Sequence, residues 1–147
     1  MLENPEEAPI QAVTTLPGGS ERILIVEDEP TLARAMSRML QSLGYGVQTR
    51  ANGEQALQVF RSQVGENPFD LVITDMTMPK MTGAELVKEI LSLKPDQPII
   101  LCTGFSEKID LEKARALGIG GFLMKPVAVE ELAALVRSLL DKQMSRI

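Results

Sequence analysis

The order of apolar and polar residues predicts strands and helices in regular alternation from about residue 21 to the end of the chain. Four short runs are apolar without internal alternation, which is typical of strands buried on both faces of a parallel sheet; they cover residues 23–26, 71–73, 99–102 and 122–124. A fifth, weaker strand is predicted over 45–50. The pattern therefore indicates an α/β domain.

Helices are predicted between these strands, where apolar residues recur every three or four positions. The first covers residues 31–43 and is closed by Gly44; its predicted inner face consists of Leu32, Met36, Met39 and Leu43. Asn52 and Thr82 are expected to cap the next two helices. Gln55 and Glu85 follow them by three positions, which is the spacing of a capping box. The predicted inner face of the helix after Asn52 consists of Ala56, Val59 and Phe60. That of the helix after Thr82 consists of Leu86, Ile90 and Leu93. The last two helices are predicted over 108–117 and 129–142.

Five strand and helix units of this length predict a doubly wound, five-stranded parallel sheet with five helices on its two faces, since each crossover must be right-handed. This domain is expected to span residues 21–147. Residues 1–20 contain several prolines and glutamates and have no sustained periodicity, which predicts a flexible tail or an interdomain linker.

Reactive side chains follow the strands at the points where the strands end. Glu27 and Asp28 follow the first strand, Asp75 follows the run at 71–73, and Thr103 and Lys125 follow the last two strands. In an open α/β sheet the binding site forms outside the carboxyl ends of the strands, so we expect these side chains to converge.

Composition limits the chemistry that this site can perform. The chain has 147 residues, no histidine, one cysteine and a net charge of −5, so histidine catalysis, a disulfide and a zinc cluster are excluded. The lack of tryptophan and of a basic block argues against direct nucleic-acid binding. No apolar run approaches the ~20 residues needed to span a bilayer. We therefore expect a soluble, cytoplasmic protein without direct membrane contact.

Carboxylates gathered at strand ends repel one another unless a cation offsets their charge. Mg²⁺ accepts a few carboxylates together with water, and a carboxylate beside Mg²⁺ is a credible phosphoryl acceptor. Lys125 would add a fixed positive charge, and the Thr103 hydroxyl could bond a new phosphoryl oxygen. The residues thus favour a phosphate-accepting site that uses Mg²⁺ as its cofactor.

Four segments, in this order and spacing, resemble the receiver domains of two-component response regulators. They are ILIVEDEP at 23–30, DLVITDMTMP at 70–79 with Gly83 after it, IILCTG at 99–104 and FLMKP at 122–126. The resemblance runs from about residue 21 to the last helix. It implies a flavodoxin-like sheet with strand order 2-1-3-4-5.

The resemblance also implies a role for individual residues. Asp75 would be the phosphoacceptor, and Lys125 would pair with it and then with the phosphoryl group. Thr103 would be the switch hydroxyl and Phe122 the aromatic residue that turns inward with it. Mg²⁺ would be held by Asp75, Asp28, Glu27 at its edge and the backbone carbonyl of Thr77. The Lys125–Pro126 bond would be cis.

Two positions depart from the usual pattern of this family. Glu27 stands where aspartate is commoner, which would alter the metal geometry, and Val127 stands where an aromatic residue is frequent, which touches only the packing of the last helix.

The resemblance implies a signalling domain rather than an enzyme, phosphorylated by a histidine kinase or a histidine phosphotransfer protein in a phosphorelay. Two alternatives remain, an Mg²⁺-dependent phosphohydrolase with an aspartyl-phosphate intermediate and an interaction module that is never phosphorylated. Thr77 counts against the first, because it stands where a hydrolase needs a second carboxylate. The linker before residue 21 also resembles the join to the C-terminal receiver of hybrid sensor histidine kinases, whose parent chain would be a protein kinase. A freestanding receiver or a phosphate shuttle is the alternative. A homodimer formed through the last helices is a further expectation.

Overall fold

One sheet of five parallel strands forms the centre of the molecule, in the order β2-β1-β3-β4-β5. The structure is a computed structural model and describes residues 16–104, 116 and 118–145. The strands are β1 (Arg22–Val26), β2 (Gly46–Arg50), β3 (Leu71–Asp75), β4 (Ile99–Thr103) and β5 (Gly121–Met124). The predicted doubly wound sheet is confirmed, together with the strand order that the resemblance implied.

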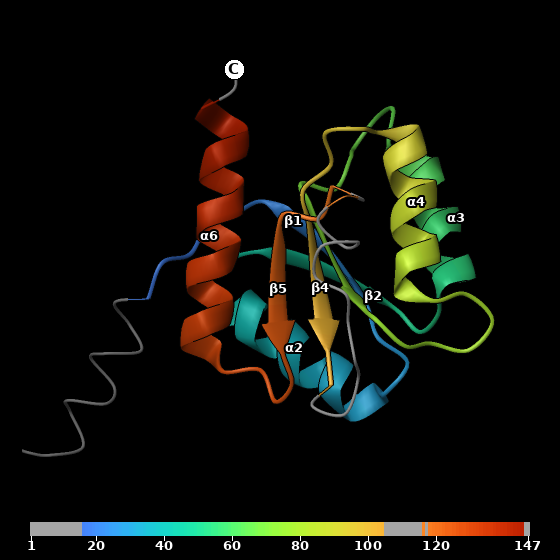
Figure 1. Cartoon of the computed structure of the whole chain (residues 1–147). Helices are drawn as coiled ribbons and strands as arrows, with labels where there is room; N and C mark the ends of the chain where they lie inside the picture. Colours follow the sequence, from blue (N-terminus) through green and yellow to red (C-terminus); the bar gives the residue numbers. More distant parts are fainter. Residues whose placement is uncertain (1–15, 105–115, 117, 146–147) are drawn as a thin grey trace, which may run out of the picture.

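Helices cover both faces of this sheet. The described residues form α2 (Pro30–Ser42), α3 (Gly53–Gln63), α4 (Gly83–Leu93) and α6 (Val129–Ser145). Helices α2 and α6 lie on one face, and α3 and α4 lie on the other (Figure 1). The fifth predicted helix, over 108–117, falls outside the described residues. None of the described helices is long and apolar enough to cross a membrane.

The central strands are buried on both sides, which explains why their sequences do not alternate. In β1, Ile23 and Ile25 pack into the core under α2 and α6, whereas Leu24 and Val26 pack into the core under α3 and α4. Strands β3 and β4 are buried along their whole length. A strand that is buried on both faces has apolar residues at most positions. Strands β3 and β4 depart from this only at their carboxyl ends, where Thr74, Asp75 and Thr103 are buried.

The predicted caps of α3 and α4 are confirmed. The Asn52 side chain accepts a hydrogen bond from the Gln55 backbone N–H at 2.8 Å. Thr82 and Glu85 form a complete capping box, with bonds of 3.2 and 2.8 Å. Caps of this kind stabilise a helix by about 1 kcal/mol each. The Thr82 capping box fixes the beginning of α4 at Gly83, eight residues after the phosphoacceptor candidate Asp75.

The predicted inner faces of two helices are partly wrong. In α2 the fully buried residues are Ala33, Met36 and Leu40, whereas most of the large apolar residues expected there are only partly buried; these are Leu32, Met39 and Leu43. The sheet contacts the centre of a wide apolar stripe, so a small residue at its middle is buried, while the large residues at its flanks pack against the core and are partly buried. Leu93, at the last residue of α4, is 40% exposed, and Val87 is buried in its place.

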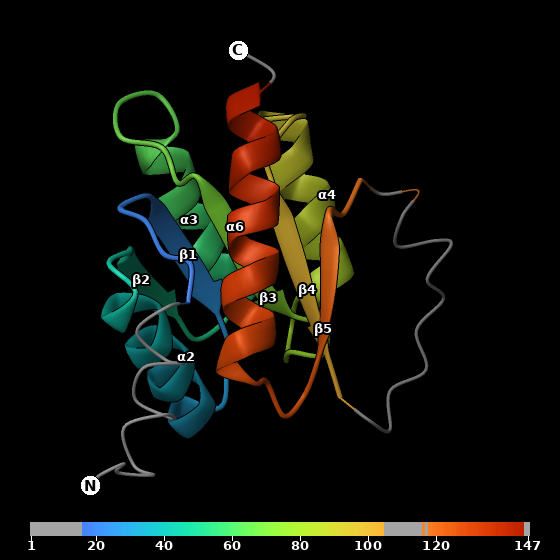
Figure 2. The ribbon, with the colours of Figure 1, turned by 90° about the vertical axis from the view of Figure 1, so that its left-hand side faces the viewer.

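The segment that leads into β1 is attached to the fold. The Gly19 N–H donates to the carbonyl of Leu43 at 3.1 Å. From α6, the Arg137 guanidinium donates to the Gly18 carbonyl at 3.0 Å and to both carboxylate oxygens of Glu21 at 3.1 and 2.7 Å. Figure 2 shows α6 running in front of the sheet beside this segment. The chain thus reaches β1 along the end of α2 and the side of α6.

The ion pair between Glu21 and Arg137 predicts a pH-dependent part of the stability. Hydrogen bonding to Arg137 lowers the pKa of Glu21. A carboxyl group with a lowered folded-state pKa contributes stability above its unfolded pKa, and this contribution is lost as the pH falls through the folded pKa. We expect Glu21→Gln to lower the free energy of unfolding by about 1 kcal/mol at neutral pH and by less in acid. Urea unfolding across pH measures this.

Glu89→Gln provides the matched control for this prediction. Glu89 lies 3.8 Å from Arg61, and both side chains are at least half exposed, so its loss should change the free energy of unfolding by only a few tenths of a kcal/mol. A deficit of Glu21→Gln that stays constant down to acidic pH would show that its cause is packing and not charge.

Candidate functional site

The parallel registers bring the expected side chains to one edge of the sheet. Asp75 pairs with Cys102 of β4, and Thr103 pairs with Met124 of β5. Glu27, which directly follows β1, lies at the same level, because Val26 pairs with Thr74. The carboxyl ends of the strands therefore meet here, as the sequence predicted.

Lys125 bridges two buried carboxylates. Its Nζ atom lies 2.7 Å from Asp75 Oδ1 and 3.2 Å from Glu27 Oε1. Asp75 is only 4% exposed and Glu27 only 3%. Two carboxylates buried together would repel each other strongly without a cation. The Lys125 ammonium group is therefore the counter-charge that both carboxylates share.

The pKa values of the site follow from this arrangement. Burial raises the pKa of Glu27, and the negative charge of Asp75 raises it further, while the Glu29 backbone N–H and Lys125 oppose the rise. Burial lowers the pKa of Lys125, but its hydrogen bonds with Asp75 and Glu27 and their charges outweigh burial, so its pKa is raised. Lys125 thus stays protonated while the site as a whole attracts positive charge.

The geometry fits a small divalent cation. One carboxylate oxygen from each of Glu27, Asp28 and Asp75 lies within 4.8 Å of the other two. Both oxygens of Glu27 already have partners, since Oε1 meets Lys125 and Oε2 accepts from the Glu29 N–H at 3.1 Å. Asp28 is exposed at the mouth of the site. A set of hard oxygen donors that leaves room for water suits Mg²⁺.

The other expected residues lie around this centre. Thr103 is buried at the end of β4, and its carbonyl accepts the Lys125 N–H at 2.8 Å. Thr77 is exposed in the loop after β3. Phe122 is half-buried and packs against the core under α3 and α4. The Lys125–Pro126 bond is cis, as the resemblance implied.

Gly83 shapes the loop that carries Asp75, a role that the sequence did not reveal. The Gly83 N–H donates to the Met76 carbonyl at 2.8 Å. A Cβ atom at this position would lie 2.3 Å from the Asp75 carbonyl oxygen, closer than atoms can approach. The start of α4 can therefore pack against the backbone of Asp75 only because residue 83 has no side chain. The Glu29 contact to Glu27 was also missed, since it depends on the loop conformation.

This combination of fold and site has the chemistry of a domain that accepts a phosphoryl group. The sheet edge provides a carboxylate held by a lysine, an adjacent acidic cluster and a hydroxyl at the end of the next strand. Phosphoryl transfer to such a group depends on positioning and on charge neutralisation.

Comparison with known proteins gives the family. The response regulator receiver domain family matches residues 23–137, and the chain belongs to it. It is therefore a receiver domain of two-component signalling.

Relatives with this domain occur in proteins of different kinds. The chain is 36% identical over 138 residues to the sensor kinase CckA of Brucella abortus, covering 94% of this chain and 14% of that protein. It is 37% identical over 122 residues to a probable transcriptional regulator, ycf27, of Porphyridium aerugineum, covering 83% of this chain and 49% of that one. The chain thus spans half or less of the length of these relatives.

Solved structures show the same fold. A receiver domain protein from Clostridium thermocellum superposes with a TM-score of 0.78 at 28% identity, covering 86% of this chain and 99% of that one. The receiver domain of the sensor histidine kinase PA1611 from Pseudomonas aeruginosa has a TM-score of 0.74 at 29% identity, covering 84% of this chain and 99% of that one. That structure has a magnesium ion coordinated in its active-site cleft.

Proposed function

We propose that Asp75 is the phosphoacceptor and that it receives its phosphoryl group from the phosphohistidine of a histidine kinase or a histidine phosphotransfer protein. The observation that carries this proposal is the contact of 2.7 Å between Lys125 Nζ and the buried Asp75 carboxylate, beside the oxygens of Glu27 and Asp28. No other described group of acidic residues has this clustered geometry.

In the transfer step a carboxylate oxygen of Asp75 attacks phosphorus in line with the scissile bond. The P–N bond to the donor imidazole breaks, and its electron pair stays on the imidazole nitrogen, which takes a proton from solvent. Lys125 holds Asp75 before the step and then follows the negative charge to the new phosphoryl oxygens. Because Lys125 is already in place, little reorganisation is needed during the reaction.

Asp28, Asp75 and the Thr77 carbonyl would hold Mg²⁺, with Glu27 at its edge. The ion, when bound, supplies charge neutralisation for the transferring group. Glu27 is committed to Lys125 and to the Glu29 N–H, which supports a role as an anchor behind the metal ligands. This commitment also gives a reason why the longer glutamate is accommodated where aspartate is commoner.

We further propose that Thr103 and Phe122 report the phosphorylated state. Inverting a population from 1:99 to 99:1 requires about 5.5 kcal/mol of differential binding, whereas a hydrogen bond to a charged group provides about 1.5 to 3 kcal/mol. Thr103 alone is therefore insufficient. Contacts of the phosphoryl group with Lys125 and the metal, and fuller burial of the partly buried Phe122, would supply the remainder.

The wider setting is also a proposal. We place the receiver domain at residues 21–147 with residues 1–20 as a linker, in a cytoplasmic protein that contacts neither nucleic acid nor membrane directly. The match to CckA, of which the chain spans 14%, supports an origin in a hybrid histidine kinase. A homodimer through the last helices stays a prediction.

Labelling with a small phosphodonor tests this function. With radiolabelled acetyl phosphate and Mg²⁺, we expect one phosphoryl group per chain, and EDTA should abolish labelling because the acidic cluster lacks its counter-ion. Beryllofluoride with Mg²⁺ should shift the amide NMR signals of the site in the same way. If neither reagent changes the protein, the alternative of an unphosphorylated interaction module would replace this proposal.

A further inference from the structure

Thr74 is a polar residue in a part of the core that is otherwise apolar. It is completely buried, at 0% exposure. Its partners on the two neighbouring strands are Val26 of β1 and Leu101 of β4, and both lie in the core under α3 and α4. Because paired residues of adjacent strands point to the same face of a sheet, Thr74 also faces this core. A valine there would have nearly the same shape and no polar group to bury, so the hydroxyl has a cost that an interaction must offset.

The Thr74 hydroxyl bonds to the backbone of the phosphoacceptor candidate that follows it. It donates to the carbonyl oxygen of Asp75 at 3.1 Å. The N–H group of the same peptide unit, which belongs to Met76, donates to the Cys102 carbonyl at 2.9 Å. The Asp75–Met76 peptide unit is therefore held at both its oxygen and its nitrogen, at one by a side chain and at the other by the sheet.

The start of α4 extends this support to the next peptide unit. The Gly83 N–H donates to the Met76 carbonyl at 2.8 Å. Gly83 also packs closely on the Asp75 carbonyl, because a Cβ atom at residue 83 would lie 2.3 Å from its oxygen. Thr77 follows directly and is exposed. Two successive carbonyl groups are thus fixed before the chain reaches the proposed metal ligand, the carbonyl of Thr77.

We propose that Thr74 is a positioning residue that orients the Asp75–Thr77 backbone, and with it the Thr77 carbonyl, for the binding of Mg²⁺. This inference rests on the function proposed above, since it concerns the same metal site. Thr74 is buried and acts only through the backbone. A ligand whose direction is set before binding loses less conformational freedom when the ion arrives. Loss of the hydroxyl should therefore weaken Mg²⁺ binding, and phosphorylation through it.

Titration of the unphosphorylated chain with Mg²⁺ tests this proposal, with the amide NMR shifts of the site as the readout. Thr74→Val removes the hydroxyl and keeps the branched shape. We expect its dissociation constant for Mg²⁺ to be about three- to tenfold higher, the range that follows from the loss of one neutral hydrogen bond. Thr74→Ser keeps the hydroxyl and should bind Mg²⁺ within about twofold of the parent.

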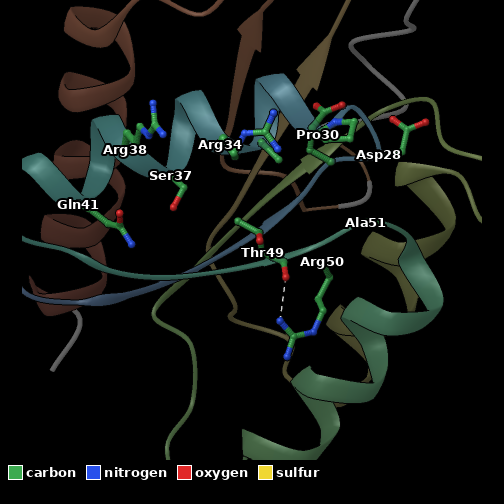
Figure 3. Close-up of a pocket in the computed structure, with 11 residues that line it drawn as sticks. Asp28, Pro30, Arg34, Ser37, Arg38, Gln41, Thr49, Arg50 and Ala51 are labelled. Carbon is green, nitrogen blue, oxygen red and sulfur yellow. Dashed lines mark hydrogen bonds between the residues drawn. The ribbon is translucent and has the colours of Figure 1, made fainter.

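Thr49→Val is the matched control. Thr49 is exposed on β2, where its backbone carbonyl accepts the bond from Arg50 at 2.8 Å (Figure 3). Strand β1 lies between β2 and β3, so the same change of side chain is made away from the Asp75 backbone. It should alter the dissociation constant by less than about twofold. Parental binding by Thr74→Val would overturn the proposal. So would a Thr74→Ser variant as weak as Thr74→Val, because the hydroxyl would then not be the cause.

Thr74→Ala gives a second comparison if Thr74→Val does not unfold cooperatively in urea. Alanine and serine both lack the methyl group of threonine, so the difference between Thr74→Ala and Thr74→Ser isolates the hydroxyl. The same three- to tenfold difference in the dissociation constant is expected, at about the strength of one hydrogen bond. Equal Mg²⁺ affinities of these two variants would overturn the proposal.

Labelling by acetyl phosphate separates this inference from the proposed function. The labelling rate of Thr74→Val should fall about threefold or more when Mg²⁺ is limiting, and the deficit should narrow as Mg²⁺ saturates. A deficit that persists at saturating Mg²⁺ would contradict action through the metal ligand. A parent chain that binds Mg²⁺ more tightly than Thr74→Val but is never labelled would refute the function and leave the positioning role in place. Normal labelling with equal Mg²⁺ affinity in the two chains would refute only the positioning role.

Discussion

Asp75→Asn should abolish phosphoryl incorporation from acetyl phosphate, lowering the rate by at least about a thousandfold. The amide has nearly the shape of the carboxylate but lacks its charge and nucleophilic oxygen. It can still accept a hydrogen bond from Lys125, which lies 2.7 Å from Oδ1 in the parent, so the fold should persist. Incorporation of radiolabel, followed by mass spectrometry of the intact chain, measures the effect.

Asp70→Asn is the control for that experiment. Asp70 precedes the same strand but lies at its opposite end, where it accepts the Arg22 N–H at 2.8 Å. It is exposed, and labelling of this variant should match the parent. Residual labelling of Asp75→Asn at a rate comparable with the parent would move the acceptor to another residue and would contradict the proposed site.

Lys125→Met should impair both function and stability. Loss of the ammonium group removes a charge-assisted bond to the transferring group, which is about 1.5 to 3 kcal/mol or a 10- to 150-fold lower rate. It also leaves Asp75 and Glu27, at 4% and 3% exposure, without their counter-charge. We expect the free energy of unfolding to fall by about 2 to 3 kcal/mol without Mg²⁺, and by less when Mg²⁺ is present.

A second substitution distinguishes lost charge from lost packing. Adding Glu27→Gln to Lys125→Met removes one of the two uncompensated charges, so urea unfolding should show partial recovery of stability. Lys94→Met, which breaks the exposed pair with Asp96 at 3.3 Å, should change stability by less than about 1 kcal/mol. A double variant that is less stable than Lys125→Met would mean that the electrostatic explanation is wrong.

The sheet was predictable because its central strands are buried on both faces. Runs such as 71–73 have no polar position, and this property is visible in the sequence. The faces of α2 and α4 were less predictable, because the sheet, and not the helix, decides which part of an apolar stripe is covered. Ala33 is therefore buried while Leu93 is exposed.

The site was predictable to the same degree as the strand ends that form it. Asp75, Glu27 and Lys125 meet because parallel strands end at one edge of the sheet. Their positions after successive strands in the sequence were therefore sufficient to predict that they converge. Contacts that depend on loop conformation were not predictable, and the bond from the Glu29 N–H to Glu27 is one.

The attachment of the segment before β1 has a consequence for how this domain combines with others. Gly18 and Glu21 are held by Arg137 of α6 at the edge of the sheet where the strands begin, and Asp75 lies at the edge where they end. The segment that leads into β1 is therefore attached at the opposite edge of the sheet from Asp75. An attachment at this edge suits a domain that is combined with different proteins, and its relatives include a sensor kinase and a probable transcriptional regulator.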